Sequence, residues 1–595
     1  MNNALKKLTA ILLCFCMLFA TATPVFAADA AQNVTQSEEH IVKMEKKASL
    51  YSGLLQFLLN DVLIRVISMI IPNLPFVGDY SQVTAGEHGY FYEGNDVFLD
   101  TDGQDYTWRL GYASKSVIPD DFGTMFKYAR GSYAPWGYAT EMYTDDEGKA
   151  EDMKVRTIIL DDKSGRGLSV FASVDCIGLS NTDVSKIRAA IDEFAKEKGI
   201  VSVNISAIHT HMAIDSQGVW NAPLTTVANN FASLAGVTTT KFGVNEDYLN
   251  TIIERTKETV EEAYADMTDG ELTYANIDLD DYFNCRNVPY ELDGNMYRLM
   301  FNPYDGSEST VVASFGCHPE VTSYGAEFDS RLSADYVYYM EKLINQAGSN
   351  FIYIQGNVGT NSGNYSNSND GYDLDGHGKA IRFGYEMAYI LLSMTDSEAE
   401  RIALNNQLGD KLGVNSNEKP EEYTPWYDGL ETVEEEKVEA VLNIKSKQLP
   451  IEVESTTSQV LIKLGLASNS LFYDKATHKY YTMTEIGYAE LGDAVKILMC
   501  PGETYSEILV GGYGLKNFGY PSLRELFGEN VILFDLMNDA AGYISPDHTY
   551  SVVAYKYNPE TDTLDNDAWC LTVSIGKHTA STLVQGYIDL VESVR

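Results

Sequence analysis

Two histidines, His209 and His211, stand two positions apart at the end of an apolar, strand-like run over residues 203–208. Side chains of a strand alternate between its two faces, so this spacing directs both imidazoles to the same side. Neutral imidazole binds zinc and can also accept and return a proton near neutral pH. The pair therefore indicates a hydrolytic metal site, although two histidines on a half-buried strand can also simply hydrogen-bond to the backbone or to water.

Polar side chains also follow four other segments that read as strands. His318 follows 310–315, and the loop 355–363 with Ser362 follows 351–354. Glu503 follows 495–499, and a loop ending at Tyr543 follows 531–536. In open α/β sheets the ligand crevice lies beyond the carboxyl ends of the strands, so these groups can converge. Histidines with one glutamate form a zinc-hydrolase ligand set. Each residue taken alone also has a structural interpretation. His318 could be a buried histidine bonded to the backbone, Glu503 an acid near the start of a helix, and Ser362 a hydroxyl in a loop.

The elements that would position these residues alternate between strand and helix. Residues 168–177, 181–198 and 200–208 predict a strand–helix–strand unit, with Gly199 ending the helix. Strands at 310–315 and 350–355 then alternate with helices at 333–346 and 379–393. We expect an α/β fold with a mixed, largely parallel sheet and an active site at the strand ends. The acidic, proline-containing stretch 415–437 reads as a surface excursion that would mark a boundary between two lobes.

The N-terminus has the features of a secretory signal peptide. Residues 1–27 carry two lysines, an apolar run and a small-residue cleavage site at Ala27, which predicts a secreted or cell-surface protein. The segment 28–104 that follows includes an amphipathic helix over 54–71, too short and too charged for a confident membrane span. This helix would either pack on the main domain, which spans 105–595, or make a peripheral contact with lipid.

Charge and cysteine content exclude several classes of protein. The 595-residue chain has a formal net charge of −42, which disfavours nucleic acid as a partner. Of the seven cysteines, two lie within 1–27 and the other five are scattered, so the sequence has neither a disulfide framework nor a structural zinc knuckle. The core must therefore be held by burial of apolar side chains, which 45% hydrophobic residues allow. The oligomeric state does not follow from the sequence.

Several blocks, in order along 105–595, resemble the neutral/alkaline, non-lysosomal ceramidases, zinc-dependent amidases that cut the fatty-acyl amide of ceramide. Residues 206–211, Ser-Ala-Ile-His-Thr-His, are similar to the S-x-T-H-T-H block of that family. The loop 357–364, Asn-Val-Gly-Thr-Asn-Ser-Gly-Asn, is similar to its N-V-G-D-V-S-P-N loop. Residues 501–504 resemble its P-G-E-T block, and 333–335 its S-G-D. The chain is similar to the catalytic domain of a divergent, bacterial-type member.

The resemblance assigns roles to seven residues of this chain. It implies zinc ligation by His209, His318, Glu503 and Tyr543. His211 would be the proton-transfer partner, and Arg286 would contact the reacting head group. Ser362 falls on the active-site serine of the family, where it would either attack the amide or orient a zinc-bound water.

Two departures from the family pattern concern the reaction site. Thr360 and Gly363 replace the aspartate and the proline of the serine loop, which puts the rigidity of the loop in doubt. A second active-site tyrosine would be Tyr555 by spacing, but the residues around it do not match, and 567–569 is an alternative place for that block. The identity of this tyrosine stays open.

Three functions follow from these observations. The first is a secreted zinc amidohydrolase that cleaves the N-acyl amide of ceramide or a related lipid-like N-acyl compound to a fatty acid and an amine. The second is a zinc hydrolase of another ester or N-acyl substrate, which the altered Ser362 loop would permit. The third, from a different class, is a cell-surface binding protein on a decayed hydrolase scaffold. The joint presence of His209, His211, His318, Glu503 and Ser362 argues against decay.

Overall fold

The structure is a computed structural model of the chain. It describes residues 77–123, 127–131, 138–218, 220, 244–287, 290–323, 329–364, 376–394, 435–463, 467–512, 518–550, 555–558, 563–566 and 574–595, with isolated residues elsewhere. The predicted signal peptide at 1–27, the helix at 54–71 and residues 415–432 of the acidic stretch lie outside the described residues. These three predictions therefore stay predictions.

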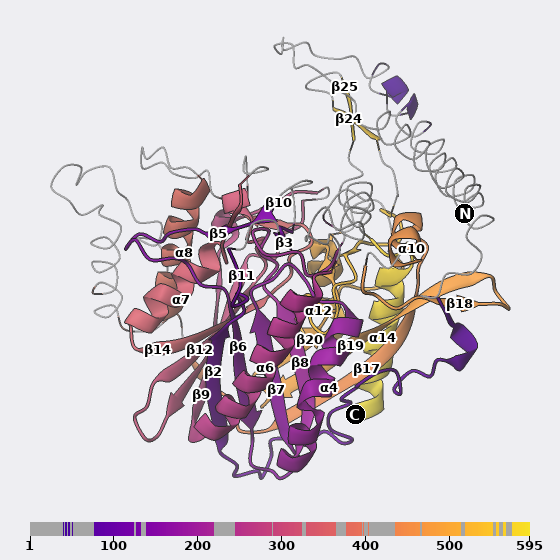
Figure 1. The fold of residues 1–595 in the computed structure, drawn as a ribbon. Coiled ribbons are helices and arrows are strands. Elements are labelled where there is room, and N and C mark those ends of the chain that lie inside the picture. The colour runs from indigo at the N-terminus through magenta and orange to yellow at the C-terminus, as the bar shows by residue number, and fades with distance from the viewer. Residues whose placement is uncertain are drawn as a thin grey trace.

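Two mixed sheets form the centre of the described part of the molecule (Figure 1). The first has the order β14-β12-β11-β9-β2-β6-β7-β8, with β16 also paired to β9, and the second has the order β1-β18-β19-β20-β22, with β17 also paired to β19. The strands of the first are β2 (Trp108–Ser116), β6 (Lys154–Asp161), β7 (Leu168–Val174), β8 (Ile200–Ala207), β9 (Thr268–Asp278), β11 (Asn295–Pro303), β12 (Ser309–Phe315), β14 (Ser349–Gln355) and β16 (Glu436–Lys437). Those of the second are β1 (Gly78–Asp79), β17 (Leu442–Glu452), β18 (Phe472–Asp474), β19 (Lys479–Leu491), β20 (Val495–Met499) and β22 (Ile532–Phe534).

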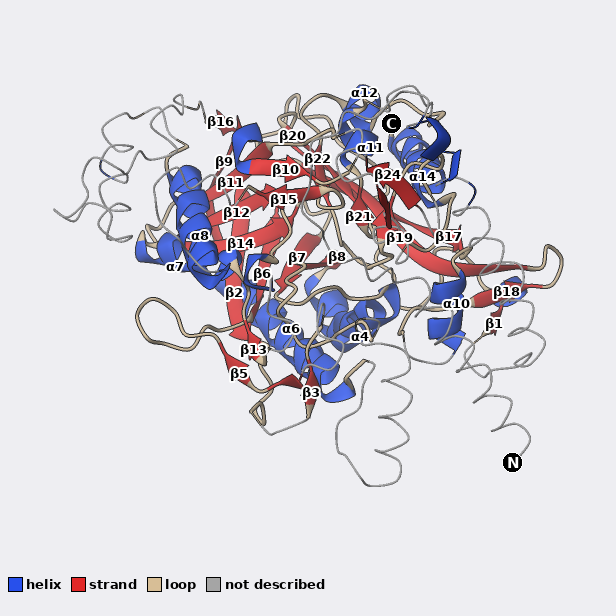
Figure 2. Ribbon diagram, turned by 90° about the horizontal axis from the view of Figure 1, so that it is seen from above, coloured by secondary structure: helices blue, strands red, loops and turns tan. Residues whose placement is uncertain are grey.

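Helices cover the outer faces of both sheets, so the molecule has four layers (Figure 2). Helices α4 (Asn181–Lys198), α6 (Glu246–Asp266), α7 (Tyr336–Gln346) and α8 (Gly376–Leu392) pack on the first sheet. Helices α11 (Ser506–Val510), α12 (Leu523–Phe527) and α14 (Thr579–Val594) pack on the second. A fourth apolar cluster, with residues of both sheets, fills the space between them.

The strands of the first sheet are apolar on both faces because each face is covered. In β12, Val311, Ala313 and Phe315 join the cluster under α7 and α8, whereas Val312 joins the cluster between the sheets. A strand buried on both sides reads as a continuous apolar run, which is the pattern that favours a parallel sheet in sequence analysis.

The prediction of an α/β fold with mixed sheets is confirmed, but the prediction that the sheet is largely parallel is wrong. Among the described strands of the first sheet, β7–β8 and β12–β14 are the parallel pairs, and the pairs that join β12, β11, β9, β2, β6 and β7 in turn are antiparallel. In the second sheet, β17, β18 and β20 all run antiparallel to β19. The double burial of the strands comes from packing sheet on sheet, a cause that the sequence pattern does not separate from helices on both faces of a parallel sheet.

Both parallel pairs belong to the strand–helix–strand units expected from the sequence. In the first unit, Ser180 caps the start of α4 by accepting from the backbone N–H of Asp183, and Gly199 ends the helix with φ of 72°. In the second unit, α7 connects β12 and β14. These units deliver β8 and β12, the strands that precede the candidate histidines.

The two units lie at opposite ends of the first sheet, yet the sheet curls so that β14 contacts β6, β7 and β8. The Ser173 hydroxyl on β7 donates to the Tyr353 carbonyl on β14 over 2.5 Å. The turn after β22 of the second sheet links the same strand ends, because Asp535 N donates to Gln355 O and Asn538 N donates to Ile205 O. The carboxyl ends of β8, β12, β14 and β22 therefore meet in one region.

Shorter elements complete the described fold. Close to the meeting strand ends are β10 (Phe283–Cys285) paired with β15 (Asn361–Gly363), and β21 (Glu503–Thr504) paired with β23 (Tyr543–Ile544). The others are β3 (Tyr128–Ala129), β4 (Tyr138–Ala139), β5 (Glu141–Met142), β13 (Arg331–Leu332), β24 (Tyr555–Asn558), β25 (Thr563–Asn566), α10 (Thr456–Lys463) and the 3-10 turns at Tyr80–Gln82, Asp280–Tyr282 and Val321–Ser323.

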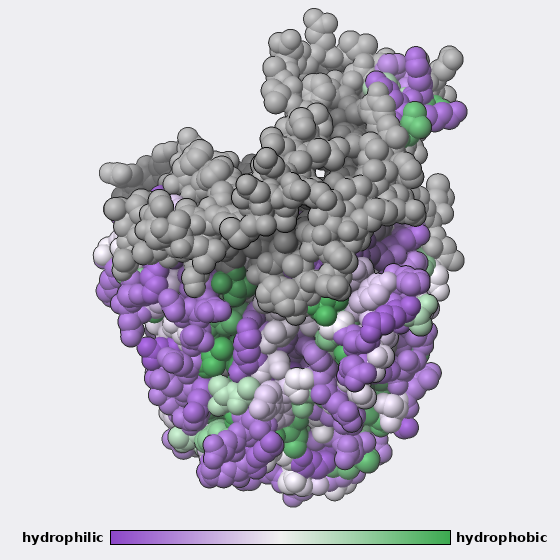
Figure 3. Space-filling view, turned by 45° about the vertical axis from the view of Figure 1, so that its right-hand side comes forward, coloured by the Kyte–Doolittle hydropathy of each residue, from purple (hydrophilic) through white to green (hydrophobic). Residues whose placement is uncertain are grey.

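The surface of the described residues is largely hydrophilic. On the face shown in Figure 3, polar side chains dominate and apolar ones gather only in small patches. A few large apolar side chains among the described residues are exposed, such as Tyr90, Val97 and Tyr304. None of the described helices combines the length and the apolar character that crossing a bilayer requires.

Candidate metal centre

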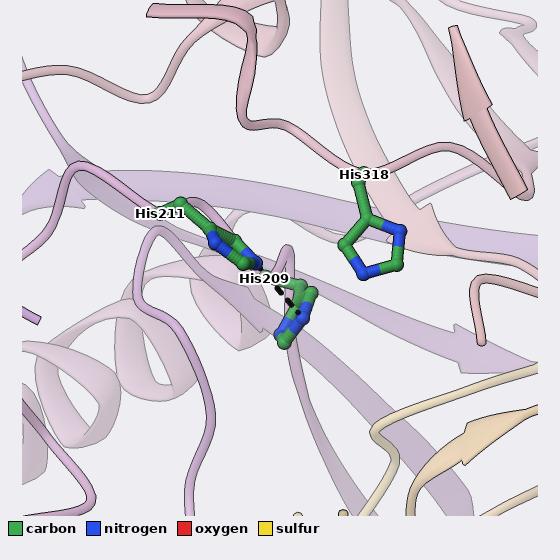
Figure 4. Close-up of side chains that lie close together, drawn as sticks. All are labelled: His209, His211 and His318. Atoms are coloured by element: carbon green, nitrogen blue, oxygen red, sulfur yellow. Dashed lines mark hydrogen bonds between the residues drawn. The ribbon is translucent and has the colours of Figure 1, made fainter. Parts of the chain in front are cut away.

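Three histidines lie together at the carboxyl ends of β8 and β12 (Figure 4). His209 and His211 follow β8, and His318 follows β12. One ring nitrogen from each of the three lies within 4.8 Å of the others, and all three side chains are buried. His209 has a positive φ of 69°, a conformation that is strained for a residue other than glycine. The strained turn bends the chain at the end of β8, where His209 and His211 enter the cluster.

Glu503 completes this group from the second sheet. Its Oε2 lies 3.2 Å from His209 Nε2 and 3.5 Å from His318 Nε2, and His211 Nε2 lies 3.2 Å from His209 Nε2. Glu503 begins β21, which follows β20 after a short turn. The four residues span nearly 300 positions of the sequence, and their donor atoms therefore meet in one small volume. His209, His211, His318 and Glu503 are called the donor cluster below.

Backbone carbonyls orient two of the imidazoles. His209 Nδ1 lies 2.7 Å from the Ile177 carbonyl oxygen, and His318 Nδ1 lies 2.8 Å from that of Asn361. A hydrogen bond from Nδ1–H to a carbonyl leaves Nε2 with its lone pair, the form that a metal needs. Both Nε2 atoms point at Glu503 Oε2, a buried oxygen that accepts no hydrogen bond from any described residue. The donor set, its burial and this oxygen could hold a metal ion.

Burial and mutual proximity set the charges of the cluster. Burial, together with the neighbouring imidazoles, holds the pKa of His211 well below its usual value, and burial with the nearby Arg286 lowers the pKa of His318 to about 4. Burial opposes the charge of His209 as well, but the Glu503 carboxylate overrides it and raises the pKa of that imidazole. Burial would raise the pKa of Glu503, but His209 and His318 outweigh it and hold that pKa below its ordinary range. His211 and His318 are thus neutral near pH 7, as metal ligands and proton acceptors must be.

Tyr543 lies next to the cluster by strand register. It pairs with Glu503 in the parallel ladder of β21 and β23, so the two side chains leave the same face of that ladder. The residue is 6% exposed, and its ring meets that of Tyr505 edge to face. The Ser574 hydroxyl donates to the Tyr543 carbonyl over 2.7 Å, which fixes the backbone of β23.

Ser362 lies on β15, one residue after the carbonyl that orients His318. It pairs with Asn284 of β10, and its side chain is 8% exposed. The Ser506 hydroxyl oxygen lies 2.8 Å from Asn357 Oδ1, 2.9 Å from Asn361 Oδ1 and 2.8 Å from Thr360 Oγ1. These contacts hold the serine loop, in which Thr360 and Gly363 stand where the family pattern has an aspartate and a proline.

Arg286 follows β10 and lies beside the serine loop. Its backbone N–H donates to the Thr360 carbonyl over 2.9 Å, and its guanidinium forms an ion pair with the fully buried Glu320. The second carboxylate oxygen of Glu320 lies 3.8 Å from His211 Nδ1. Of the seven residues assigned from the sequence, the structure brings His209, His211, His318 and Glu503 into direct proximity and joins Arg286 to them through Glu320.

Sequence reasoning missed Glu320 and Asp535. Asp535 accepts from the backbone N–H groups of Val358 and Thr504, and so ties the serine loop to β21. Asp535 could have been found from the sequence, because an aspartate at the end of an apolar run is unusual. Glu320, a glutamate in a loop two positions after His318, gave no such signal. Tyr555 is the first residue of β24, but its side chain and the alternative block at 567–569 lie outside the described residues.

Comparisons with known proteins support the fold. No protein-family model matches the sequence, and no curated protein is significantly similar to it. Among solved structures, neutral ceramidase from Pseudomonas aeruginosa is similar with a TM-score of 0.51 and 16% identity, over 82% of this chain and 74% of that one. A ceramidase complexed with C2 is similar with a TM-score of 0.54 and 14% identity, over 82% and 75% of the respective chains. The predicted resemblance to the ceramidases is confirmed as a likeness of fold.

Proposed function

We propose that this protein is a zinc-dependent amidohydrolase that cleaves the N-acyl amide of ceramide or a related N-acyl lipid. The observation that carries the proposal is the donor cluster, because its buried Nε2 and carboxylate oxygens converge from two sheets within a ceramidase-like fold. A buried set of this composition suits zinc, and a metal held by few protein ligands leaves a position open for water or substrate.

His209, His318 and Glu503, with Tyr543 beside them, would hold the ion. Zinc at this position would lower the pKa of a water molecule toward about 7 and polarise the amide carbonyl. His211 is neutral and adjacent, so its imidazole would take a proton during attack and return it to the departing amine. The Tyr543 hydroxyl, if free of the metal, would donate to the oxyanion that develops on the amide.

Ser362 and Arg286 would act on the substrate from the other side of the cluster. The Ser362 hydroxyl stands in the loop that carries the His318-orienting carbonyl, where it would act as the nucleophile or orient the attacking water. Arg286 would contact the amine-bearing half of the substrate. Because Ser506 and Asp535 hold the loop through several hydrogen bonds, the missing proline does not argue against catalysis.

Secretion and contact with lipid belong to the same proposal. An enzyme that acts on a membrane lipid from outside the cell needs the export that the signal at 1–27 would provide. The amphipathic helix at 54–71 would make the peripheral contact with the lipid surface. Neither segment lies within the described residues.

The test is direct detection of both products. The mature protein, residues 28–595, is incubated with ceramide, with and without a zinc chelator, and free fatty acid and sphingosine are measured by mass spectrometry. We expect release of both products in equal amounts, abolished by the chelator and restored by zinc. The His209→Ala variant serves as the matched control that lacks one donor.

Two other outcomes separate the remaining functions. A folded protein that holds stoichiometric zinc but releases neither product would discard ceramide, and a panel of other N-acyl and ester compounds would then identify the scissile bond. A folded protein that binds no zinc would overturn the enzyme proposal in favour of a binding protein on a hydrolase scaffold.

A further inference from the structure

Glu320 is a buried carboxylate that none of the assigned roles explains. It lies two residues after His318 and is 0% exposed. A tight turn fixes its position, because its N–H donates to the His318 carbonyl and its own carbonyl accepts from the N–H and the hydroxyl of Ser323. The carboxylate is thus held at a set place beside the donor cluster.

The two oxygens of this carboxylate face different partners. Oε1 forms the ion pair with the Arg286 guanidinium, whose side chain is 27% exposed, and Oε2 lies 3.8 Å from His211 Nδ1. A carboxylate in a buried site is stable only when a cation compensates it, and Arg286 supplies that cation. Part of the Arg286 side chain is exposed, whereas its Nη2 atom, which forms the ion pair, is buried.

The ion pair with Glu320 changes how the Arg286 guanidinium would interact with a substrate. An arginine without a neighbouring carboxylate attracts anionic groups, whereas an arginine paired with a buried carboxylate presents hydrogen-bond donors and little net charge. An anionic group on the amine half of a substrate that contacts Arg286 would also lie near the Glu320 carboxylate, which already takes up the charge of the guanidinium.

We propose that Glu320 is the residue that selects the substrate class, by neutralising Arg286 so that the site takes N-acyl compounds with an uncharged amine half and rejects anionic ones. The inference rests on the proposed N-acyl amidase function and refines it. Glu320 is a positioning residue, because it acts through Arg286 and not on the scissile bond.

The test compares two substrates that share an acyl chain and differ in charge, N-lauroylethanolamine and N-lauroylglycine. The measured quantity is the ratio of their kcat/KM values, since this ratio expresses selectivity and cancels any effect of Glu320 on His211 that both substrates share. We expect the unmodified protein to prefer the neutral compound by about tenfold or more, the scale on which one like-charge contact acts.

Glu320→Gln keeps the size of the side chain and removes its charge. We expect this variant to lose most of the preference, through a lower KM for the glycine conjugate. Glu320→Asp retains the charge and should keep the preference. In the double variant Glu320→Gln, Arg286→Gln, the gain toward the anionic compound should disappear. Zinc content and melting temperature of each variant show that the fold is retained.

Failure of this inference is distinguishable from failure of the proposed function. An unchanged ratio in an active Glu320→Gln protein would overturn the selectivity role and leave the amidase standing. Affinities of the two compounds for the zinc-depleted protein, measured by calorimetry, give the same comparison without turnover. If every form cleaves neither compound but the zinc-depleted proteins show the expected shift in affinity, the role of Glu320 holds, and the ceramide assay alone decides the amidase proposal. If no form binds or cleaves either compound, the role of Glu320 is overturned, whatever the ceramide assay shows.

Discussion

At the scale of single residues, the donor cluster shows how much of the site depends on atoms outside the ligand set. The carbonyls of Ile177 and Asn361 decide which nitrogen of His209 and of His318 faces Glu503. The strained φ of His209 brings its ring into the cluster at the cost of backbone energy, which the surrounding buried contacts must offset. The sequence pattern predicts which residues lie at the site, and these backbone contacts set the orientation of their rings.

The ligand assignment predicts different outcomes for two neighbouring histidines. His318→Ala removes a donor, so its zinc affinity should fall by at least about 10-fold, as loss of even an outer-sphere partner typically costs 10–100-fold. His211→Ala should keep zinc but lower kcat by about 10²–10⁴, the usual contribution of a positioned acid–base group. Metal analysis by mass spectrometry and steady-state kinetics measure the two effects. The exposed-turn variant His478→Ala is the control, and loss of zinc from His211→Ala would instead make that residue a ligand.

At the scale of elements, the short helix α11 supports the serine loop. Ser506 at its first position contacts Asn357, Thr360 and Asn361 of that loop. We expect Ser506→Ala to lower the free energy of unfolding by about 1–3 kcal/mol, the cost of leaving buried polar partners unsatisfied. It should also lower kcat without changing the zinc content.

A matched serine provides the control for Ser506. Ser169 on β7 is equally buried, and its hydroxyl has no hydrogen-bond partner among the described residues. Ser169→Ala should therefore leave both stability in urea and turnover nearly unchanged. Equal losses in the two variants would show that burial, and not the loop contacts, accounts for the effect of Ser506→Ala.

Glu507, the second residue of α11, should make the stability of the fold depend on pH. Burial, and then the charge of Glu291, raises the pKa of Glu507 to about 7 from the ordinary value of 4.5. Between these two values the folded protein binds the proton and the unfolded chain does not, so stability from this group falls as pH rises from about 4.5 to 7 and is constant below that window. The shift corresponds to about 3 kcal/mol.

The Glu507→Gln variant isolates this contribution. It cannot titrate, so its free energy of unfolding should fall less between pH 5 and pH 8 than that of the unmodified protein. Urea unfolding at the two pH values measures the difference. Parallel pH profiles for the two proteins would exclude Glu507 as a source of the pH dependence.

The elements also show where prediction from sequence succeeds and where it ends. The bounds of α4 follow from local signals, a serine cap and a left-handed glycine, and the structure has the same residues. Strand direction has no such local signal, because a doubly buried strand such as β12 looks the same in either orientation. A short motif is enough to identify a candidate ligand such as Glu503 in the sequence. The contact between Glu320 and Arg286, in contrast, depends on long-range packing of β10 against the loop after β12.

At the scale of the whole molecule, the candidate site joins the two central sheets. His209 and His318 follow strands of the first sheet, whereas Glu503 and Tyr543 begin β21 and β23, the short strands that come after β20 and β22 of the second. The turn at 535–538 bonds to the ends of β8 and β14, so the same junction is already held by backbone hydrogen bonds. A metal ion at this junction would cross-link the layers of the fold.

Zinc should therefore stabilise the entire described fold and not only its loops. A ligand that binds only the folded state at 100 times its Kd adds about 2.7 kcal/mol to the free energy of unfolding. For a chain of 595 residues this corresponds to a rise in melting temperature of about a few degrees, because the unfolding entropy grows with chain length. Differential scanning calorimetry of the zinc-loaded and chelator-treated protein measures the shift. His318→Ala should show a smaller zinc-dependent shift at the same zinc concentration. Equal melting temperatures for the loaded and stripped unmodified protein would mean that the donor cluster does not bind the ion across the two sheets.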